Sequence, residues 1–434
     1  MITPRARDLV NFSATRKRRQ WPTGMRWLFV GLLVAAALSG VLWGMVWWEE
    51  RPLRAVERLL EDSQNAQALE LANLFLRDHS KHGPAIALKA RALVRLGHAA
   101  EAAQLFDEVG AATEADMRDC ARAYLMQERW VQALPISEYL VLQNPDDPDL
   151  LHELSACRAK LGRYDEALDA ANRFAMISGF ESRGQLLIGT LQQERGNNRK
   201  ACDSWQKLLE LNPEATNLQI SSDEFFLQHG AALLSVGEPA AAIDKLSQSI
   251  KLNPTAGARS ILGLAWLRLG KMDAAEKEWR LALELDPHQQ AARQGLAELS
   301  MRKLDFRQAI DLLKPLADSP DISRESAFLL QRAYTIAGDT ELASRWNAKV
   351  ESIRKRDELQ HSVDQVLLES PGTMWGQALR CYRLAEQGNW DQAEILLSPL
   401  MQNPSIHPFV IRLGAAIRKR SALPDLNQLP IALF

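Results

Sequence analysis

The sequence predicts an all-α protein in which one membrane-spanning helix precedes a solenoid of helical hairpins. An uncharged run lies near the N-terminus, and apolar residues then recur at three- and four-residue spacing. One pattern of small residues returns about every 34 positions. The 434 residues exceed what one compact core usually holds, but repeats that pack only on their neighbours are not bound by that limit.

The uncharged run from Trp27 to Trp48 is long enough to cross a bilayer. As a helix it extends roughly 33 Å, and a bilayer core is about 30 Å thick. Residues 1–26 contain seven basic side chains and only Asp8 as an acid. The positive-inside rule therefore predicts a cytoplasmic N-terminus and extracytoplasmic repeats, as for a bacterial inner-membrane protein facing the periplasm. The alternative is a cleaved signal peptide, whose apolar core is usually about 7–15 residues long.

Charge, cysteine positions and the absence of catalytic motifs limit the functions that the chain is expected to have. The net charge is −2 although the N-terminal segment is basic, so the remainder is acidic and nucleic acid is not an expected partner. Cys120, Cys157, Cys202 and Cys381 lie far apart, which predicts buried packing residues and neither a disulfide framework nor a zinc site. No phosphate loop, HExxH or GxSxG is present, so we expect no cofactor, no metal and no catalytic residue.

Small residues at two positions fix the register of the repeat. Units open near Gly83, Glu114, Pro148, Ser182, Asp223, Ala256, Gln290, Arg324 and Met374. The twentieth residue of each is alanine: Ala102, Ala133, Ala167, Ala201, Ala242, Ala275, Ala309, Ala343 and Ala393, with Ala68 in an earlier, weaker unit. The eighth residue is small except at Gln331. Both positions predict two helices that cross closely within each unit.

The clearest unit runs from Ala256 to Pro287, with Gly263 eighth, Gly270 in the turn and Ala275 twentieth. These residues resemble the tetratricopeptide repeat (TPR) family, and the resemblance covers about residues 52–405. It implies a right-handed α-solenoid of about nine to ten helix–turn–helix units.

The predicted organisation has six parts. They are a basic cytoplasmic segment (1–26), the transmembrane helix (27–48), the main block of the solenoid (49–350), an extended helix or connector (351–373), a C-terminal unit with a capping helix (374–420) and a tail (421–434). Extra residues at about 217–223 lengthen one junction between units. Extra residues between Glu351 and Thr373 predict a helix that continues beyond its normal end.

The resemblance also implies a concave face lined by the first helix of each unit. It places Arg91, Arg95, Arg118, Arg122, His152 and Arg183 near that face. Such a stripe suits an acidic peptide or a C-terminal carboxylate, which it would hold through charge-assisted hydrogen bonds. The alternative is an ordinary solvated helix face partly paired with nearby acids. The asparagines of the family's carboxylate clamp are missing, so binding of chaperone tails is not implied.

Together these features predict a membrane-anchored scaffold that binds protein partners and catalyses no reaction. One alternative is an accessory subunit of an enzyme that makes or exports an envelope polysaccharide or lipid. A remote alternative is an enzyme with an unrecognised site around Arg118, Arg122 and His152. The sequence leaves the oligomeric state open.

Overall fold

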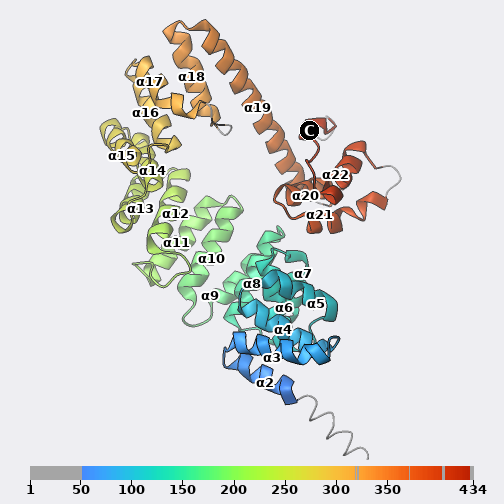
Figure 1. Cartoon of the computed structure of the whole chain (residues 1–434). Helices are drawn as coiled ribbons and strands as arrows, with labels where there is room; N and C mark the ends of the chain where they lie inside the picture. Colours follow the sequence, from blue (N-terminus) through green and yellow to red (C-terminus); the bar gives the residue numbers. More distant parts are fainter. Residues whose placement is uncertain (1–50, 318, 320–321, 371, 403–405, 431–434) are drawn as a thin grey trace, which may run out of the picture. The chain divides into compact units, whose positions relative to one another are not determined.

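The computed structural model describes residues 51–434 except 318, 320–321, 371, 403–405 and 431–434, and it is all-α over that range (Figure 1). The run from Trp27 to Trp48 lies outside the described residues. Within them, the length and apolarity that a bilayer-spanning helix needs are not combined in any helix. The predicted membrane anchor therefore stays a prediction.

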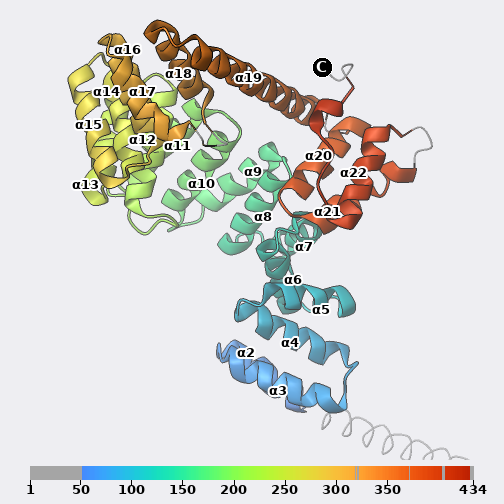
Figure 2. The same cartoon turned by 45° about the horizontal axis from the view of Figure 1, so that its top comes forward.

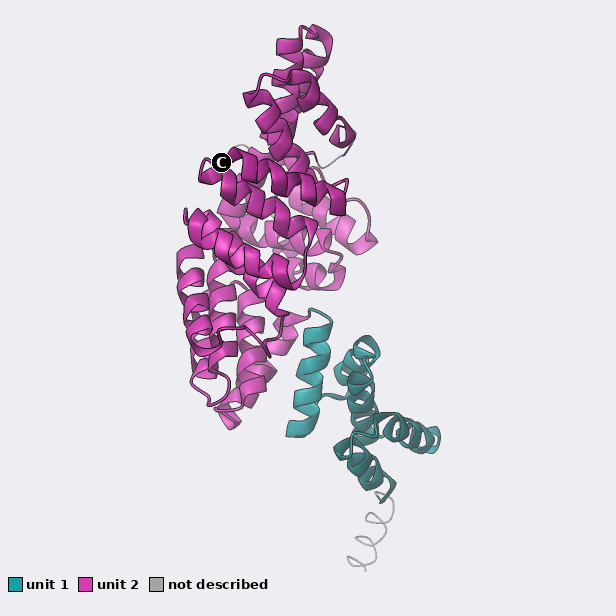
Figure 3. Ribbon diagram, turned by 90° about the vertical axis from the view of Figure 1, so that its left-hand side faces the viewer, with its two compact units in different colours: residues 1–128 teal, residues 129–434 magenta. Residues whose placement is uncertain are grey.

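The chain divides into two compact units, residues 1–128 and 129–434 (Figure 3). In unit 1 the helices are α2 (Arg51–Glu61), α3 (Asn65–Asp78), α4 (Gly83–Arg95), α5 (Ala99–Val109) and α6 (Glu114–Met126). Since α6 ends unit 1 and α7 opens unit 2, the repeat predicted to begin at Glu114 is divided between the two units.

Unit 2 contains the remaining helices of the solenoid (Figure 2). They are α7 (Trp130–Gln143), α8 (Pro148–Lys160), α9 (Tyr164–Ala175), α10 (Glu181–Glu194), α11 (Asn198–Leu211), α12 (Ser222–Ser235), α13 (Pro239–Leu252), α14 (Ala256–Arg268), α15 (Met272–Leu285), α16 (Gln290–Arg302), α17 (Phe306–Leu313), α18 (Arg324–Ala337), α19 (Thr340–Glu369), α20 (Met374–Glu386), α21 (Trp390–Leu397) and α22 (Pro408–Lys419). Short 3₁₀ turns lie at Lys314–Leu316, Leu400–Gln402 and Leu426–Gln428.

The turn inside most hairpins contains a residue in the left-handed conformation. Glycine occupies it with φ between 73° and 86° in seven units: Gly97, Gly162, Gly196, Gly237, Gly270, Gly338 and Gly388. Glycine adopts this conformation without a steric penalty because it has no Cβ. Three units place Ser63 (φ 59°), Glu128 (φ 54°) and Leu304 (φ 64°) there instead. The turn geometry is therefore kept even where the sequence lacks glycine.

The alanine register predicted from the sequence is the inner packing surface of the hairpins. Nine of the ten alanines are fully buried: Ala68, Ala102, Ala133, Ala167, Ala201, Ala242, Ala275, Ala309 and Ala393. Ala343 is only half-buried. Its unit has Gln331 at the eighth position, where the other units have a small residue. The two helices of a unit therefore cross closely where its eighth and twentieth residues are both small.

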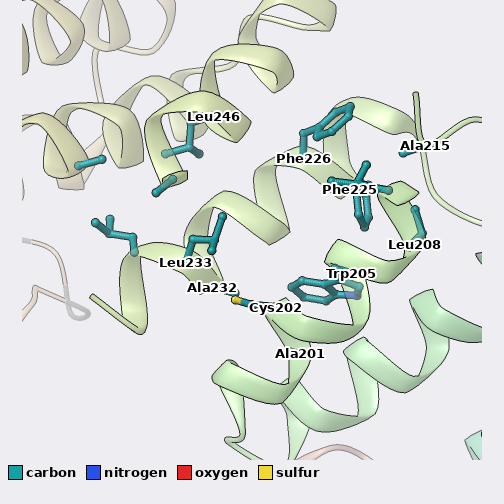
Figure 4. Close-up of a cluster of buried hydrophobic side chains, with 14 of the residues drawn as sticks. Ala201, Cys202, Trp205, Leu208, Ala215, Phe225, Phe226, Ala232, Leu233 and Leu246 are labelled. Carbon is teal, nitrogen blue, oxygen red and sulfur yellow. The ribbon is translucent and has the colours of Figure 1, made fainter. Parts of the chain in front are cut away.

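Two units combine the eighth-position glycine with a tryptophan on the second helix. A Cβ built on Gly189 would lie 2.2 Å from Nε1 of Trp205, and one on Gly263 would lie 2.4 Å from Nε1 of Trp279. Each indole N–H donates to a backbone carbonyl of the first helix. The distance is 3.4 Å from Trp205 to Leu186 and 3.0 Å from Trp279 to Ser260. Figure 4 shows Trp205 in its cluster with Leu208 and Phe225. Only glycine leaves room for the indole at these positions.

The helix that departs most from the repeat is α19, which is 30 residues long and runs through most of the segment expected to be a connector. Ile353 in α19 packs in a cluster with α16, α17 and α18 residues, whereas Val363 packs in the C-terminal cluster. The tail that follows α22 contributes Leu429, which is 6% exposed, to this second cluster. One helix therefore joins two separate apolar cores of unit 2.

Candidate functional site

Two of the predicted groove arginines form buried ion pairs inside unit 1. Arg91 Nε donates to Asp119 Oδ2 at 3.3 Å, and an Arg91 Nη atom lies 3.7 Å from Asp116. Arg95 donates to the same Asp119 oxygen at 3.0 Å and to the Leu60 carbonyl at 2.7 Å. Side-chain exposure is 9% for Arg91 and 4% for Asp119. These arginines therefore join α4 to α6, and internal carboxylates neutralise most of their charge.

The two acids in this cluster were not predicted. Asp116 and Asp119 lie three residues apart on α6, so both face the same side of the helix. Asp116 also accepts from the Thr113 backbone N–H at 3.1 Å and so completes a capping box at the start of α6. A pair of acids at this spacing, opposite arginines four residues apart, is the sequence signal that would have indicated the cluster.

Arg118 and Arg122 lie further along α6 and more toward solvent. Arg118 Nε donates to Glu114 Oε1 at 3.2 Å, an i,i+4 pair on the helix surface. Arg122 is exposed. Of the four predicted groove residues in unit 1, these two present cationic surface, and Arg91 and Arg95 hold the helices together.

The other two predicted residues, His152 on α8 and Arg183 on α10, belong to unit 2. Arg183 Nε donates to the Asn217 carbonyl at 3.2 Å and its guanidinium lies over the Phe180 ring. A hydrogen bond links His152 to Gln219. Asn217 and Gln219 belong to the loop of residues 212–221, which contains most of the extra residues predicted at about 217–223, while residues 222 and 223 begin α12. The structure therefore brings His152 and Arg183 to one inserted loop.

Burial decides the charge of His152. Removal from water lowers the pKa of its imidazole below the usual range, against opposing effects of the Gln219 hydrogen bond and of Asp149. The ring also packs 5.8 Å from the Phe174 ring. His152 is therefore a neutral, half-buried packing residue near neutral pH and adds no positive charge to the stripe.

A recess in unit 1 adjoins the arginine cluster. It has a volume of about 380 Å³ and is lined by α2, the N-terminal half of α4 and the α5–α6 turn. Arg91 and Asp116 form part of its wall, and His82 caps α4 beside it by accepting from the Ala85 N–H at 3.3 Å. The lining mixes both charges with apolar surface, which suits a peptide segment better than a fixed anion.

Reactive groups are not gathered at any of these places. All four cysteines are buried, and none forms a disulfide within the described part of the chain. Burial raises the pKa of the Cys157 and Cys202 thiols to about 11 and that of Cys381 to about 12. A thiol with so high a pKa is a poor nucleophile at neutral pH. Among the described residues, no group of three or more His, Cys, Asp or Glu side chains is arranged to hold a metal ion.

Known families match three stretches of the chain. Residues 50–177 match a family described as Psidin, N-terminal TPR repeats region. Residues 184–215 and 227–290 each match a family described as Tetratricopeptide repeat. These stretches contain all or most of each helix from α2 to α15.

Individual relatives are similar over shorter lengths. Small glutamine-rich tetratricopeptide repeat-containing protein 2 of Mycosarcoma maydis is 32% identical over 98 residues, which cover 22% of this chain and 26% of the relative. Heat shock protein STI1 of Saccharomyces cerevisiae is 29% identical over 119 residues, which cover 27% and 20%. The chain thus spans about a quarter of these relatives or less.

Among solved structures, the C-terminal part of a TPR repeat-containing protein from Cytophaga hutchinsonii is similar, with 15% identity and a TM-score of 0.45. The match covers 56% of this chain and 98% of that one. The family matches agree with the alanine and glycine register of the hairpins. The chain is therefore a tetratricopeptide-repeat protein, a class that serves as a scaffold for protein–protein interaction.

Proposed function

We propose that this protein is a membrane-anchored scaffold that holds protein partners together at a membrane and catalyses no reaction. The observation that carries this proposal is that hairpins of one repeat type make up the described chain almost from end to end. Their surface includes recesses lined by charged and apolar side chains, which suit segments of other proteins. Binding and co-localisation would then be the whole mechanism.

Within unit 1, the partner would contact the recess beside Arg91 together with Arg118 and Arg122 on α6. Guanidinium groups bind carboxylates through paired hydrogen bonds, so the expected partner segment is acidic. Arg91 and Arg95 contribute mainly by fixing α4 against α6, because Asp119 already pairs with both. In unit 2, Arg183 and His152 would contribute through the surface of the loop they hold.

Charge reversal tests this site. Full-length protein would be crosslinked in its own membranes, captured by affinity, and its partners identified by mass spectrometry. The double variant Arg118→Glu, Arg122→Glu should lose a defined partner. The matched control is Arg77→Glu, Lys81→Glu, which makes the same change in charge at exposed residues in and just after α3. Equal loss in both variants would count against the groove, and no specific partner in the wild type would count against the scaffold.

We also propose the membrane arrangement predicted from the sequence. Residues 27–48 would span a bacterial inner membrane, with residues 1–26 in the cytoplasm. The main block (49–350), the connector (351–373), the C-terminal unit (374–420) and the tail (421–434) would lie in the periplasm. Support comes from the uncharged run and from the basic residues that precede it.

Protease accessibility tests this orientation. With the outer membrane opened, protease should digest the repeats while an N-terminal epitope stays protected, and the protein should resist carbonate extraction. Deletion of residues 1–48 should release the repeats from the membrane. Repeats that become accessible only after the inner membrane is broken would contradict the orientation, and loss of the epitope from the mature protein would indicate a cleaved signal peptide.

A further inference from the structure

Unit 2 contains a larger recess, which is lined by repeats that are not consecutive in the sequence. It has a volume of about 600 Å³ and is lined by the start of α7, the α8–α9 turn, the end of α19, and both α20 and α21. Figures 1 and 2 both show α20 and α21 beside α7 and α8. The long helix α19 leads the chain to these last repeats, so helices more than 200 residues apart in sequence line one recess.

Apolar side chains that packing leaves open to water form much of the wall of this recess, beside four glutamines and three basic residues. Val131 on α7 and Ile395 on α21 are each 59% exposed. Leu161, Leu384 and Leu396 add aliphatic surface. Exposed apolar groups that converge on one concavity, rather than being scattered singly, are typical of binding sites.

The charged residues of the lining are all basic. Lys160, Arg380 and Arg383 contribute to it, and no acidic residue is among the described residues that line it. This is unusual in a protein whose net charge is −2. Lys160 pairs with Glu194 at 3.4 Å and Arg383 with Asp364 at 2.7 Å.

Arg380 differs from its two basic neighbours. It is exposed on α20, and among the described residues no carboxylate lies within ion-pair distance of it. A guanidinium at the edge of an apolar recess is suited to bind a carboxylate that enters with an aliphatic body. The recess therefore has the complementary chemistry for an aliphatic segment that carries an acid.

We propose that this recess binds a short aliphatic, acidic segment of a partner protein, with the aliphatic side chains against Val131, Ile395 and Leu396 and a carboxylate on Arg380. The proposal rests on the scaffold function proposed above, but it concerns a different surface from the concave face of consecutive repeats. The volume lies within the range of 300–1,000 Å³ typical of ligand pockets. It admits a few side chains of an extended or single-turn segment and no folded domain.

Two variants remove the two kinds of contact separately. Arg380→Glu reverses the exposed charge, and Ile395→Asp places a charge on the apolar wall. The matched controls are Lys207→Glu on α11, an exposed lysine outside the recess, and Leu252→Asp on α13, whose side chain is 57% exposed. Since all four side chains are exposed, the variants should fold like the wild type, which circular dichroism would check.

The probe is a phage-displayed library of random 12-residue peptides, selected against the full-length protein in detergent. We expect enriched peptides that combine leucine or isoleucine with aspartate or glutamate. Arg380→Glu and Ile395→Asp should each lower the affinity for the synthesised peptides at least about tenfold. The first removes a charge-assisted hydrogen bond and the second an apolar contact, and the loss of either is enough for such a change. Lys207→Glu and Leu252→Asp should leave affinity unchanged.

Four outcomes would overturn the proposal. Peptides without acidic residues, or peptides that bind the recess variants as well as the wild type, would show that the recess is not their site. Failure to enrich any peptide would do the same. If the full-length protein self-associates and Ile395→Asp makes it monomeric, then a second copy of the chain occupies the recess.

None of these results would by itself contradict the proposed scaffold function. Enriched peptides that lose binding only in Arg118→Glu, Arg122→Glu would place the site in unit 1 and leave the function intact. Only the absence of specific partners in the membrane capture experiment, together with the absence of peptide binding, would remove both proposals.

Discussion

At the scale of single residues, His229 on α12 shows how far the core tolerates a polar group. It is 1% exposed, lies 5.8 Å from the rings of both Trp205 and Phe225, and its Nδ1 has no hydrogen-bond partner among the described residues. Burial, which disfavours the charged form, lowers the pKa of its imidazole to about 4. The unfolded chain, with a pKa near 6.5, binds this proton more readily.

Stability should therefore fall as the pH decreases from about 6.5 towards 4, because the unfolded state gains a proton that the folded state excludes. The slope from this one group is at most about 1.4 kcal/mol per pH unit. Urea unfolding of the wild type at pH 7 and pH 5 would measure it. His229→Leu should reduce the difference, and His288→Gln, at an exposed histidine, should not. An unchanged pH dependence in His229→Leu would contradict this assignment.

Leu304 allows a second prediction, on backbone strain. It occupies the left-handed turn position with φ 64° and is 72% exposed, so its side chain gains little from packing. Leu304→Gly should raise stability by up to about 1 kcal/mol, since relief of roughly 1–2 kcal/mol is offset by the greater freedom of glycine in the unfolded chain. The reverse change, Gly270→Ala at φ 73°, should destabilise although no atom lies within 4 Å of the new Cβ. Urea midpoints that move in the same direction would contradict the explanation.

The structural roles of residues could be predicted from sequence where local geometry restricts which residue types a position accepts. The alanines of the twentieth position could be assigned from sequence because only small residues fit at the close helix crossing. The turn glycines could be assigned because the left-handed backbone conformation favours glycine. The role of Arg91 could not, because it depends on Asp119, 28 residues away on another helix. Side-chain pairing across helices follows from packing and rotamers, which a single sequence does not show.

At the scale of elements, the ion cluster between α4 and α6 contributes to the stability of unit 1, whereas the sequence predicted Arg91 and Arg95 as part of a binding face. Arg91, Arg95, Asp116 and Asp119 bring two positive and two negative charges together with little access to water. A buried charge that loses its partner is strongly destabilising, whereas an exposed pair contributes little.

Asp119→Ala should therefore destabilise unit 1 by about 3 kcal/mol, since it leaves Arg91 buried without its nearest partner. Glu114→Ala, which removes the surface partner of Arg118, should cost less than about 0.5 kcal/mol. Hydrogen exchange of the α4 and α6 amides would measure both changes locally. Similar exchange rates in the two variants would contradict a structural role for the buried cluster.

At this scale the lengthened helix could be predicted, but the packing of the inserted loop could not. The extra residues near 351–373 indicated a helix that continues beyond its normal end, and α19 does so as far as Glu369. The insertion near residue 217 gave no sign of where its loop would pack. Its contacts with His152 and Arg183 depend on carbonyl and amide groups that carry no helical periodicity.

At the scale of the whole molecule, the repeat fold was predictable because ten units repeat the same constraint, so that each supports the register of the next. The division at residues 128 and 129 was not predictable from that register, because alanine stands at the twentieth position on both sides of it. The recess lined by α7 and α21 was equally hidden, since local periodicity says nothing about helices so far apart in sequence. The membrane segment lies outside the described residues and stays a prediction.

The most direct test of the scaffold function is site-specific photo-crosslinking in the native membrane. A photoreactive amino acid would replace Arg122 on the predicted binding face of unit 1, and in a second protein it would replace Arg77 on α3 as the control. We predict discrete adducts with one or a few proteins from position 122 and none of these from position 77. The same adducts from both positions, or none from either, would contradict a scaffold that binds its partners on this face.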